Sequence, residues 1–385
     1  MLWAAQPISR IELARHININ RSTATEIFKP LINSDIIQEK PLSQEGESRS
    51  IGRPPIGLSF NDQNDFFIGV NLGVSHSQIG KTTLKWDFSG GKEFVTPEEP
   101  RKALDFLRDK IKKLWGETDQ RRLRVIGISV PGPTDKERRK LIYAPHLGWE
   151  NLEIADYLEK SLDLKKAGVS IVVENNATAS AMYEVRLKFA RDKILRDYTV
   201  VRSGTGIGVG LVFDGEVYRG TGRGKGIAGE FGHMTIMAGG KPCVCGNQGC
   251  WERYASAPAA ASLYLGDRRQ LGELSSIRFA EIVNRALAGE IRARRTLEKV
   301  GDYLGVGIAN IIMGFGVPNV ILSGRLVYGW QFLSGPLREA IGKSMARNVE
   351  NWSVESGEPQ GASLGGALEI AVEEFFAHHL IPGSG

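Results

Sequence analysis

The chain has 385 residues, 42% of them apolar and 24% charged, which is typical of a globular protein with two or three domains. Its formal net charge of +5 is small for this length, so charge alone does not identify a nucleic-acid-binding protein. Three cysteines exclude a disulfide framework, and no apolar run approaches the roughly 18 residues of a membrane span. Because an export signal is also lacking, we expect a cytoplasmic protein without a membrane partner.

The first sixty residues predict two short helices followed by a hairpin. Ser9 and Glu12 have the spacing of a capping box, which starts the first helix. After a polar break, a second helix is expected from residue 21 to about residue 33, with an inward face made of Ala24, Ile27, Phe28, Leu31 and Ile32. Pro30 lies within this pattern and should kink or end the helix.

The alternation of Ile56, Leu58 and Phe60 predicts the return strand of a β-wing. Two helices and a wing indicate a winged helix-turn-helix, whose second helix enters the DNA major groove. DNA contacts are therefore expected from Arg21, Ser22, Thr23, Thr25 and, at the wing tip, Arg53. The alternative is a small helical cap used for dimerisation.

From residue 65 onward, buried strands alternate with helices. The stretches "FFIGVNLG" (66–73) and "YTVVRSGTGIGVGLVFDG" (198–215) each run a strand into a glycine turn, so we expect two α/β domains that face each other across a cleft. The predicted division is a DNA-binding domain (1–62), a smaller α/β domain (63–174, completed by helix 361–380) and a larger one (175–360). The turn "SGTGIGVG" either binds phosphate or simply closes a hairpin.

A cluster of metal-binding residue types lies between positions 233 and 250. His233, Cys243, Cys245 and Cys250 supply one nitrogen and three sulfurs, the tetrahedral set that structural zinc prefers. The alternative is three incidental cysteines beside a core histidine. Zinc would fix the loop that carries Glu230 and Glu252, whose carboxylates are good acceptors for sugar hydroxyls.

Together these segments resemble the ROK family of repressors and sugar kinases. The most specific match is "GEFGH" (229–233) followed by "CVCGNQGCWE" (243–252), and further matches are "SVPGP" (129–133), "APHLGWEN" (144–151) and "GASLGGAL" (361–368). The resemblance implies an α/β fold in which a winged helix-turn-helix precedes a two-domain, actin-like sugar-kinase body of ribonuclease H-like type with a structural zinc loop.

The same resemblance implies the roles of individual residues. Zn²⁺ would be bound by the four residues of the cysteine cluster, and a sugar by Gly132, Asn151, Asn175, Asn176, Glu230, His233 and Glu252. In kinase members the stretch that matches "ENNAT" (174–178) carries the aspartate that acts as general base, where this chain has Asn176. The phosphate turn, Asp-x-Gly-Gly-Thr in kinases, reads Asn-Leu-Gly-Val-Ser at 71–75.

Three functions are compatible with this sequence. An amide cannot accept the hydroxyl proton, and general-base assistance is worth about 10² to 10⁴ in rate, so Asn176 and Asn71 argue against an active sugar kinase with an added DNA module. A regulator whose body binds another protein is disfavoured by the retained sugar residues. We therefore expect a non-enzymatic repressor of carbohydrate metabolism that binds operator DNA and a monosaccharide effector. It should act as a homodimer, with a tetramer as the alternative.

Overall fold

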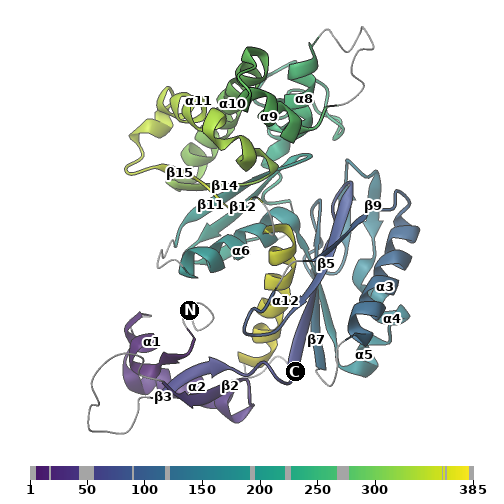
Figure 1. The fold of residues 1–385 in the computed structure, drawn as a ribbon, viewed down its shortest axis with the longest axis vertical. Helices are drawn as coiled ribbons and strands as arrows, with labels where there is room; N and C mark the ends of the chain where they lie inside the picture. Colours follow the sequence, from purple (N-terminus) through teal and green to yellow (C-terminus); the bar gives the residue numbers. More distant parts are fainter. Residues whose placement is uncertain are drawn as a thin grey trace.

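A computed structural model describes residues 6–16, 19–42, 56–88, 91–117, 122–190, 196–221, 227–266, 277–357, 359 and 362–380. Arg53, expected at the wing tip, lies outside the described residues. Within them the chain forms a small N-terminal unit and two large β-sheets with helices packed on and between them (Figure 1).

The N-terminal unit contains two helices and a three-stranded sheet. Helices α1 (Arg10–His16) and α2 (Arg21–Asn33) pack together, and the strands are arranged in the order β1 (Ile8–Ser9), β3 (Ile56–Phe60), β2 (Ile37–Pro41). The capping box is confirmed: the Ser9 backbone N–H donates to Glu12 Oε2 (3.1 Å) and the Glu12 N–H donates to Ser9 Oγ (3.2 Å). Asn20 caps α2 by accepting the Thr23 N–H at 2.8 Å.

The expected span of α2, to about residue 33, is confirmed, but its expected inward face is wrong at one position. The helix does not end at Pro30 but continues to Asn33, because Pro30 stands in the last turn and its carbonyl accepts the closing N–H of Ser34 (3.0 Å). Ile27 does not face inward: 44% of its surface is exposed, whereas Ala24, Phe28 and Leu31 form the buried face. An exposed aliphatic side chain thus lies on the outer face of α2.

The two large sheets share one topology. Each begins with an antiparallel three-stranded meander and adds two parallel strands on the other side of the first strand. The first sheet has the order β10 (Ser170–Asn175), β7 (Arg122–Val130), β4 (Asp65–Asn71), β5 (His76–Thr82), β6 (Lys92–Val95). The second has the order β13 (Glu216–Tyr218), β12 (Ile207–Phe213), β11 (Tyr198–Ser203), β14 (Asn319–Gly324), β15 (Ser353–Ser356). The recurrence that the two glycine turns suggested is therefore a repeat of the whole sheet.

Helices cover the outer faces of both sheets. The first sheet packs against α3 (Pro100–Gly116), α4 (Ile154–Ser161) and α5 (Leu164–Ala167). The second packs against a helical layer made of α7 (Glu252–Ala255), α8 (Ala257–Leu265), α9 (Phe279–Leu287), α10 (Ile291–Phe315) and α11 (Trp330–Gly342). A two-stranded hairpin, β8 (Leu141–Ala144) with β9 (Trp149–Leu152), was not anticipated from the sequence.

Two helices fill the space between the sheets. Helix α6 (Asn176–Ala190) packs on β11 and β12, α12 (Ala362–Leu380) packs on β4 and β7, and the two helices pack against each other (Figure 1). Glycines permit this approach: a Cβ on Gly127 would lie 2.1 Å from the Ala367 carbonyl oxygen, and one on Gly69 would lie 2.7 Å from Leu368. At the far end of α12, the ring of Phe376 lies 5.8 Å from that of Phe60 in the N-terminal unit.

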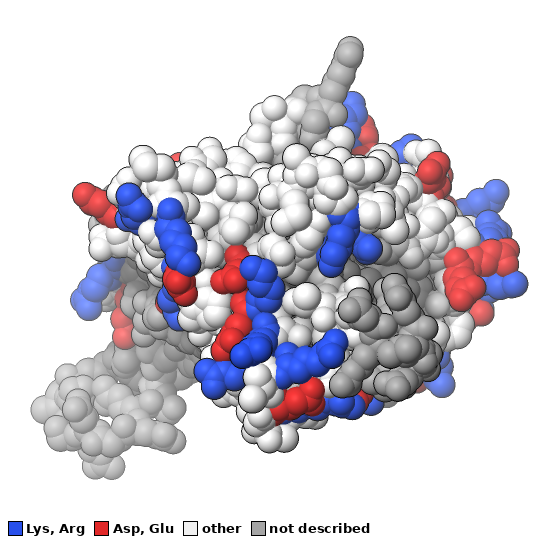
Figure 2. Space-filling view, turned by 90° about the horizontal axis from the view of Figure 1, so that it is seen from above, with Lys and Arg blue, Asp and Glu red and all other residues white. Residues whose placement is uncertain are grey.

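The described surface carries both signs of charge. At the end of the molecule formed by the helical layer of the second sheet, basic and acidic side chains alternate with broad uncharged areas (Figure 2). Within the described residues, every helix is too short or too polar to cross a membrane.

The contact between α12 and the first sheet can be tested with a pair of glycine variants. We expect Gly127→Ala to lower the free energy of unfolding by roughly 1–3 kcal/mol, because the new methyl group would overlap a backbone carbonyl of α12. Gly314→Ala, in α10 with no atom within 4 Å of the new Cβ, should be neutral or stabilising by up to about 1 kcal/mol. Chemical denaturation of both variants measures this difference, and equal stability would contradict the packing described.

Candidate ligand cleft and metal centre

A cleft with a volume of about 830 Å³ lies between the two sheets. The ends of β4, β10, β11 and β14 and the first residues of α12 contribute to its wall, which includes Asn71, Asn175, Gly204, Gly324 and Ser363. Ligand sites in open α/β folds lie at the carboxyl ends of parallel strands, and both sheets direct such ends into this cleft. Its volume is that of a small-molecule site.

The side chain of Asn175 organises the end of the cleft that contains the predicted sugar-binding residues. Its Oδ1 accepts the backbone N–H groups of Ala177 (2.8 Å) and Thr178 (3.2 Å), so Asn175 caps helix α6. Its Nδ2 donates to the Gly132 carbonyl (3.1 Å) and to Glu230 Oε1 (3.2 Å). Both donors and both acceptor positions of the amide are therefore engaged within the protein. A direct hydroxyl contact from Asn175 stays a prediction, whereas its role in positioning Glu230 is visible in the structure.

Two carboxylates in the cleft have different environments. Burial, together with repulsion from Glu252, raises the pKa of Glu230 to about 7. Burial also disfavours the charged form of Glu252, but hydrogen bonding to His146 and the charge of His233 outweigh it and lower the pKa of Glu252. The His146 Nε2 lies 3.3 Å from Glu252 Oε1. Glu252 is therefore suited to accept hydrogen bonds from a ligand.

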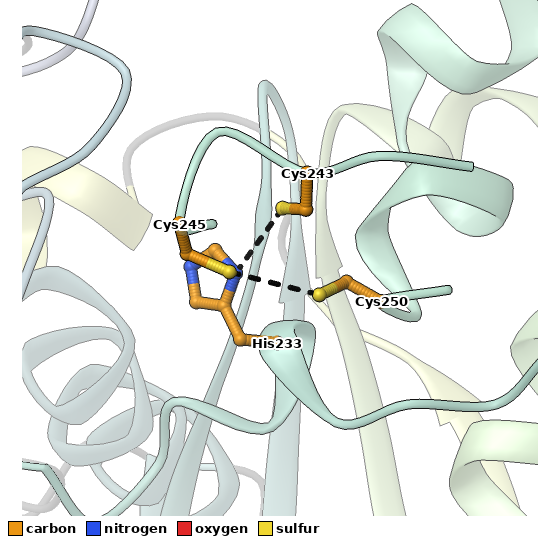
Figure 3. A group of neighbouring side chains, drawn as sticks. All are labelled: His233, Cys243, Cys245 and Cys250. Atoms are coloured by element: carbon orange, nitrogen blue, oxygen red, sulfur yellow. Dashed lines mark hydrogen bonds between the residues drawn. The ribbon is translucent and has the colours of Figure 1, made fainter. Parts of the chain in front are cut away.

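The four predicted metal ligands converge on one centre (Figure 3). Their ligand atoms all lie within 4.8 Å of one another, with Cys245 Sγ 3.7 Å from Cys250 Sγ and Cys243 Sγ 3.5 Å from His233 Nδ1. Tetrahedral zinc with bonds of about 2.3 Å to sulfur and about 2.1 Å to nitrogen requires separations of about 3.8 Å and about 3.6 Å. The residues present therefore fit a tetrahedral transition metal.

The electrostatics of the cluster also favour a cation. Burial raises the pKa values of the Cys243 and Cys250 thiols, so these sulfurs stay protonated unless a positive ion stabilises the thiolates. The Sγ of Cys243 lies 3.3 Å from Glu252 Oε1, where a thiolate beside a carboxylate would be repulsive without a metal. With Nδ1 on the metal side, the Nε2 of His233 is left on the side of Glu230, at 4.0 Å from its Oε2.

The glycine turn between β11 and β12 closes a hairpin and also shapes the cleft. Ser203 and Ile207 are paired across it, and a Cβ on Gly206 would lie only 2.5 Å from Glu252 Oε2. Any other residue at position 206 would displace this carboxylate. The prediction that "SGTGIGVG" closes a hairpin is thus confirmed, and the turn is also part of the cleft wall.

The remaining sugar-site residues are distributed unequally. Gly132, Asn176, Glu230, His233 and Glu252 line the cleft with Asn175. Asn151 does not: it is exposed on β9 with a left-handed backbone (φ 47°), so a ligand contact from it would require the cleft to close. Asn71 lines the cleft but is 5% exposed and accepts a hydrogen bond from Ser129 Oγ (3.0 Å).

Sequence reasoning missed four cationic or basic residues in the cleft wall: His76, His146, Arg202 and Arg325. The segment "APHLGWEN" contains His146, but a single histidine gave no sign that it would face Glu252, which is about a hundred residues away. Arg202 follows Val200 and Val201 near the end of a strand, where a single charge is the only signal. Arg325 follows the Ser-Gly end of β14.

The predicted DNA-contacting residues lie at the start of α2. Arg21 and Ser22 are exposed, whereas Thr23 and Thr25 are half-buried. The Ser22 hydroxyl donates to Asn20 Oδ1 (2.6 Å) and the Thr25 hydroxyl donates to the Arg21 carbonyl (3.0 Å), so both remain able to accept hydrogen bonds. Lys29 and Ile27, which were not proposed as contacts, are exposed on the same helix.

Two sheets of identical topology around a cleft, with sugar-binding residue types and a metal-ligand cluster at its edge, define a sugar-kinase-like body. The chain belongs to the ROK family, whose model matches residues 67–374. It is 29% identical over 375 residues to the xylose repressor of Bacillus subtilis, a match that covers 96% of this chain and 92% of the repressor.

Two solved structures resemble the chain to different extents. A ROK family transcriptional regulator, a homologue of the Escherichia coli MLC protein, superposes with a TM-score of 0.78 at 26% identity and covers 98% of this chain and 96% of its own. A ROK family glucokinase from Streptomyces griseus, in complex with glucose and AMPPNP, gives a TM-score of 0.66 at 25% identity and covers 80% of this chain and 99% of its own. The regulator thus accounts for a larger share of this chain than the kinase does.

The metal centre leads to a stoichiometry and a stability prediction. We expect purified protein to contain about one transition-metal ion per chain, because the four ligand atoms complete one tetrahedral site. Cys245→Ser should lower both the metal content and the melting temperature, since metal binding is coupled to the fold of this loop. Val244→Ser, at the exposed neighbouring position, is the control and should change neither. Full metal loading of Cys245→Ser would rule out the assigned ligand set.

Proposed function

We propose that this protein is a sugar-responsive transcriptional repressor of carbohydrate metabolism that binds a monosaccharide without phosphorylating it. The observation that carries the proposal is that residues expected to bind a sugar line the cleft around Asn176, an amide where the resemblance to kinases implies the catalytic base. The match to a xylose repressor and to a ROK transcriptional regulator over nearly the whole chain supports it.

The N-terminal unit would be the DNA-binding part, a winged helix-turn-helix. Its helix pair and the sheet order β1-β3-β2 have the arrangement in which a second helix, here α2, enters the major groove. Arg21 and Lys29 would contact phosphates, and Ser22 and Ile27 would contact base edges and thymine methyl groups. In the proposed division of the chain at residues 62, 174 and 360, this unit is the separate DNA-binding domain.

The cleft would be the effector site. Glu252 and Glu230 accept sugar hydroxyls, Asn175 holds Glu230 in place, and the Nε2 of His233 donates to the sugar while its Nδ1 ligates the metal. The metal would be structural Zn²⁺, since one nitrogen and three sulfur ligands complete a tetrahedron without an open position. Zinc supplies rigidity to the loop that carries these acids.

Loss of catalysis would follow from two neutral side chains in the cleft. The side chain of Asn176, the first residue of α6, faces the cleft with no hydrogen-bond partner among the described residues, and an amide there can orient a hydroxyl but cannot take its proton. Asn71 cannot supply the charge that positions magnesium near the phosphates. The alternative, an active sugar kinase, is favoured only by the resemblance to the glucokinase fold.

Regulation requires that the effector binds two arrangements of the protein with different affinities. An open and a closed cleft would be such a pair of arrangements. Asn151 lies outside the cleft as it stands and would reach the ligand only in the closed one. A homodimer would place two copies of α2 on paired half-sites and multiply the specificity of one short helix.

Arg21 tests the DNA-binding role. We expect Arg21→Ala to weaken binding to DNA selected from a random pool by about tenfold or more, because a phosphate or base contact of this kind contributes roughly 1–3 kcal/mol. Sugar-dependent thermal stabilisation should not change, since the cleft is intact. Arg295→Ala, which removes an exposed arginine from α10, is the control. Undiminished DNA binding by Arg21→Ala would contradict the assignment of α2.

The absence of catalysis is tested by sugar-dependent ADP release. The wild-type protein should show none with glucose, xylose or N-acetylglucosamine. Asn176→Asp alone should also remain inactive, and only the double variant Asn176→Asp with Asn71→Asp should give measurable turnover, because base and metal charge belong to one reaction. Asn284→Asp, at an exposed position on α9 outside the cleft wall, is the matched amide-to-acid control. Turnover by the wild type would favour the kinase alternative.

A further inference from the structure

Two arginines, Arg202 and Arg325, lie near each other in the wall of the cleft. Arg202 is the penultimate residue of β11, and Arg325 follows Gly324 at the end of the neighbouring strand β14. The strands are parallel, with Arg202 aligned with Ser323, so the two arginines leave the sheet at the same edge and both line the cleft. Burial and the nearby charge of Arg325 lower the pKa of Arg202 to about 10.

Neither arginine has a counterion in the part of the chain that the structure describes. Arg202 Nη2 donates to Ser363 Oγ (2.6 Å), while its Nε is buried without a hydrogen-bond partner. Other partly buried arginines of the body are paired: Arg219 Nε lies 2.7 Å from Glu174, and Arg186 Nε lies 2.5 Å from Glu369. Two like charges that face one cavity repel each other, and an anion between them would remove this repulsion and satisfy the free donors.

The surroundings of the arginine pair favour an anion that is bound without a metal. Ser363 is the second residue of α12, so the positive end of the helix dipole adds to both guanidinium charges. The Ser129 hydroxyl lies between Ser363 and Asn71: its Oγ is 3.4 Å from the Ser363 carbonyl oxygen and 3.0 Å from Asn71 Oδ1. An aspartate at position 71 would offer a negative charge for magnesium, whereas the amide of Asn71 offers none.

The arginine pair is within reach of the sugar end of the same cleft. In the β11–β12 hairpin, Arg202 is paired with Gly208, and Gly206 in the turn approaches Glu252. Paired residues of an antiparallel ladder are about 5 Å apart, and two further residues span at most about 7 Å. A single molecule the size of a substituted monosaccharide can therefore contact Glu252 and Arg202 together.

We propose that Arg202 and Arg325 form a phosphate-binding subsite, and that the effector of this protein is a phosphorylated monosaccharide whose hydroxyls meet Glu230 and Glu252. This inference rests on the proposed function and narrows its ligand class. A nucleotide shares the phosphate chemistry, but the neutral Asn71 gives its magnesium no ligand charge, so the sugar phosphate is the better fit.

The test compares phosphorylated and neutral sugars on the full-length protein by calorimetry at fixed ionic strength. The probes are glucose and N-acetylglucosamine, the 1-phosphate and 6-phosphate of each, inorganic phosphate, and ADP with magnesium. At least one sugar phosphate should bind about ten- to a hundredfold more tightly than its parent sugar, as expected for charge-assisted hydrogen bonds from a guanidinium.

Variants of the two arginines test which residues cause the tighter binding of the sugar phosphate. Arg325→Ala, at an exposed position that need not affect folding, should remove most of the preference for the phosphate and leave affinity for the parent sugar within about twofold. Arg202→Lys keeps a charge but loses the planar fork, and should weaken the phosphate preference in the same direction. Arg295→Ala, an exposed arginine on α10, should leave all affinities unchanged.

Each other outcome overturns the inference. These outcomes are equal affinity for sugars and their phosphates, a phosphate preference that survives Arg325→Ala, binding of ADP alone, and no binding of any phosphate. Failure of the proposed function is a separate result, because it would appear as a lack of specific DNA binding and of any response to sugars. Tight binding of neutral sugars with no phosphate gain would leave the repressor proposal intact.

Discussion

The side-chain amide of Asn175 is the connection on which the rest of the cleft depends. It ends strand β10, caps helix α6, and reaches both the Gly132 carbonyl on the side of the first sheet and Glu230 on the side of the second. Because all four of these bonds use one planar group, the start of α6, the turn after β7 and the acid of the metal loop cannot move independently. The position of Asn176, one residue further, is set by the same cap.

A network of charges extends this connection toward α12. Glu174 is 3% exposed and lies 2.7 Å from Arg219 and 3.2 Å from Arg138, and both arginines also contact Glu373 on α12. Removing one member of such a group would leave a buried charge unpaired, which costs more than the pair itself contributes. Strand β10, which carries Glu174 and Asn175, is thereby linked by ion pairs to the helix that reaches the N-terminal unit.

The sequence allowed much of the fold to be anticipated because its local signals agree. The capping box at Ser9, the amphipathic helix over 100–116 and the strands that run into glycine turns depend on neighbouring residues alone. The metal centre was also predictable, since all its cysteines lie within eight residues. His146 and Arg202 could not be found in this way, because Glu252 and Ser363, which they contact, are distant in the chain. Ile27 was misplaced since helical periodicity assigns a face but not the amount of surface that neighbours cover.

Helix α12 can act as a lever, because it is long and contacts the cleft near one end and the N-terminal unit near the other. Ser363, near its start, bonds Arg202 in the cleft, and Phe376, thirteen residues later, packs on Phe60 below α2. At about 1.5 Å per residue these points are roughly 20 Å apart along a rigid rod, so a tilt of about 5° at the cleft displaces the far end by about 2 Å. A shift of this size is several times the roughly 0.5 Å range of N–H···O distances, so it is enough to break a hydrogen bond. A displacement of Arg202 can thus be passed along α12 to the N-terminal unit without unfolding any element.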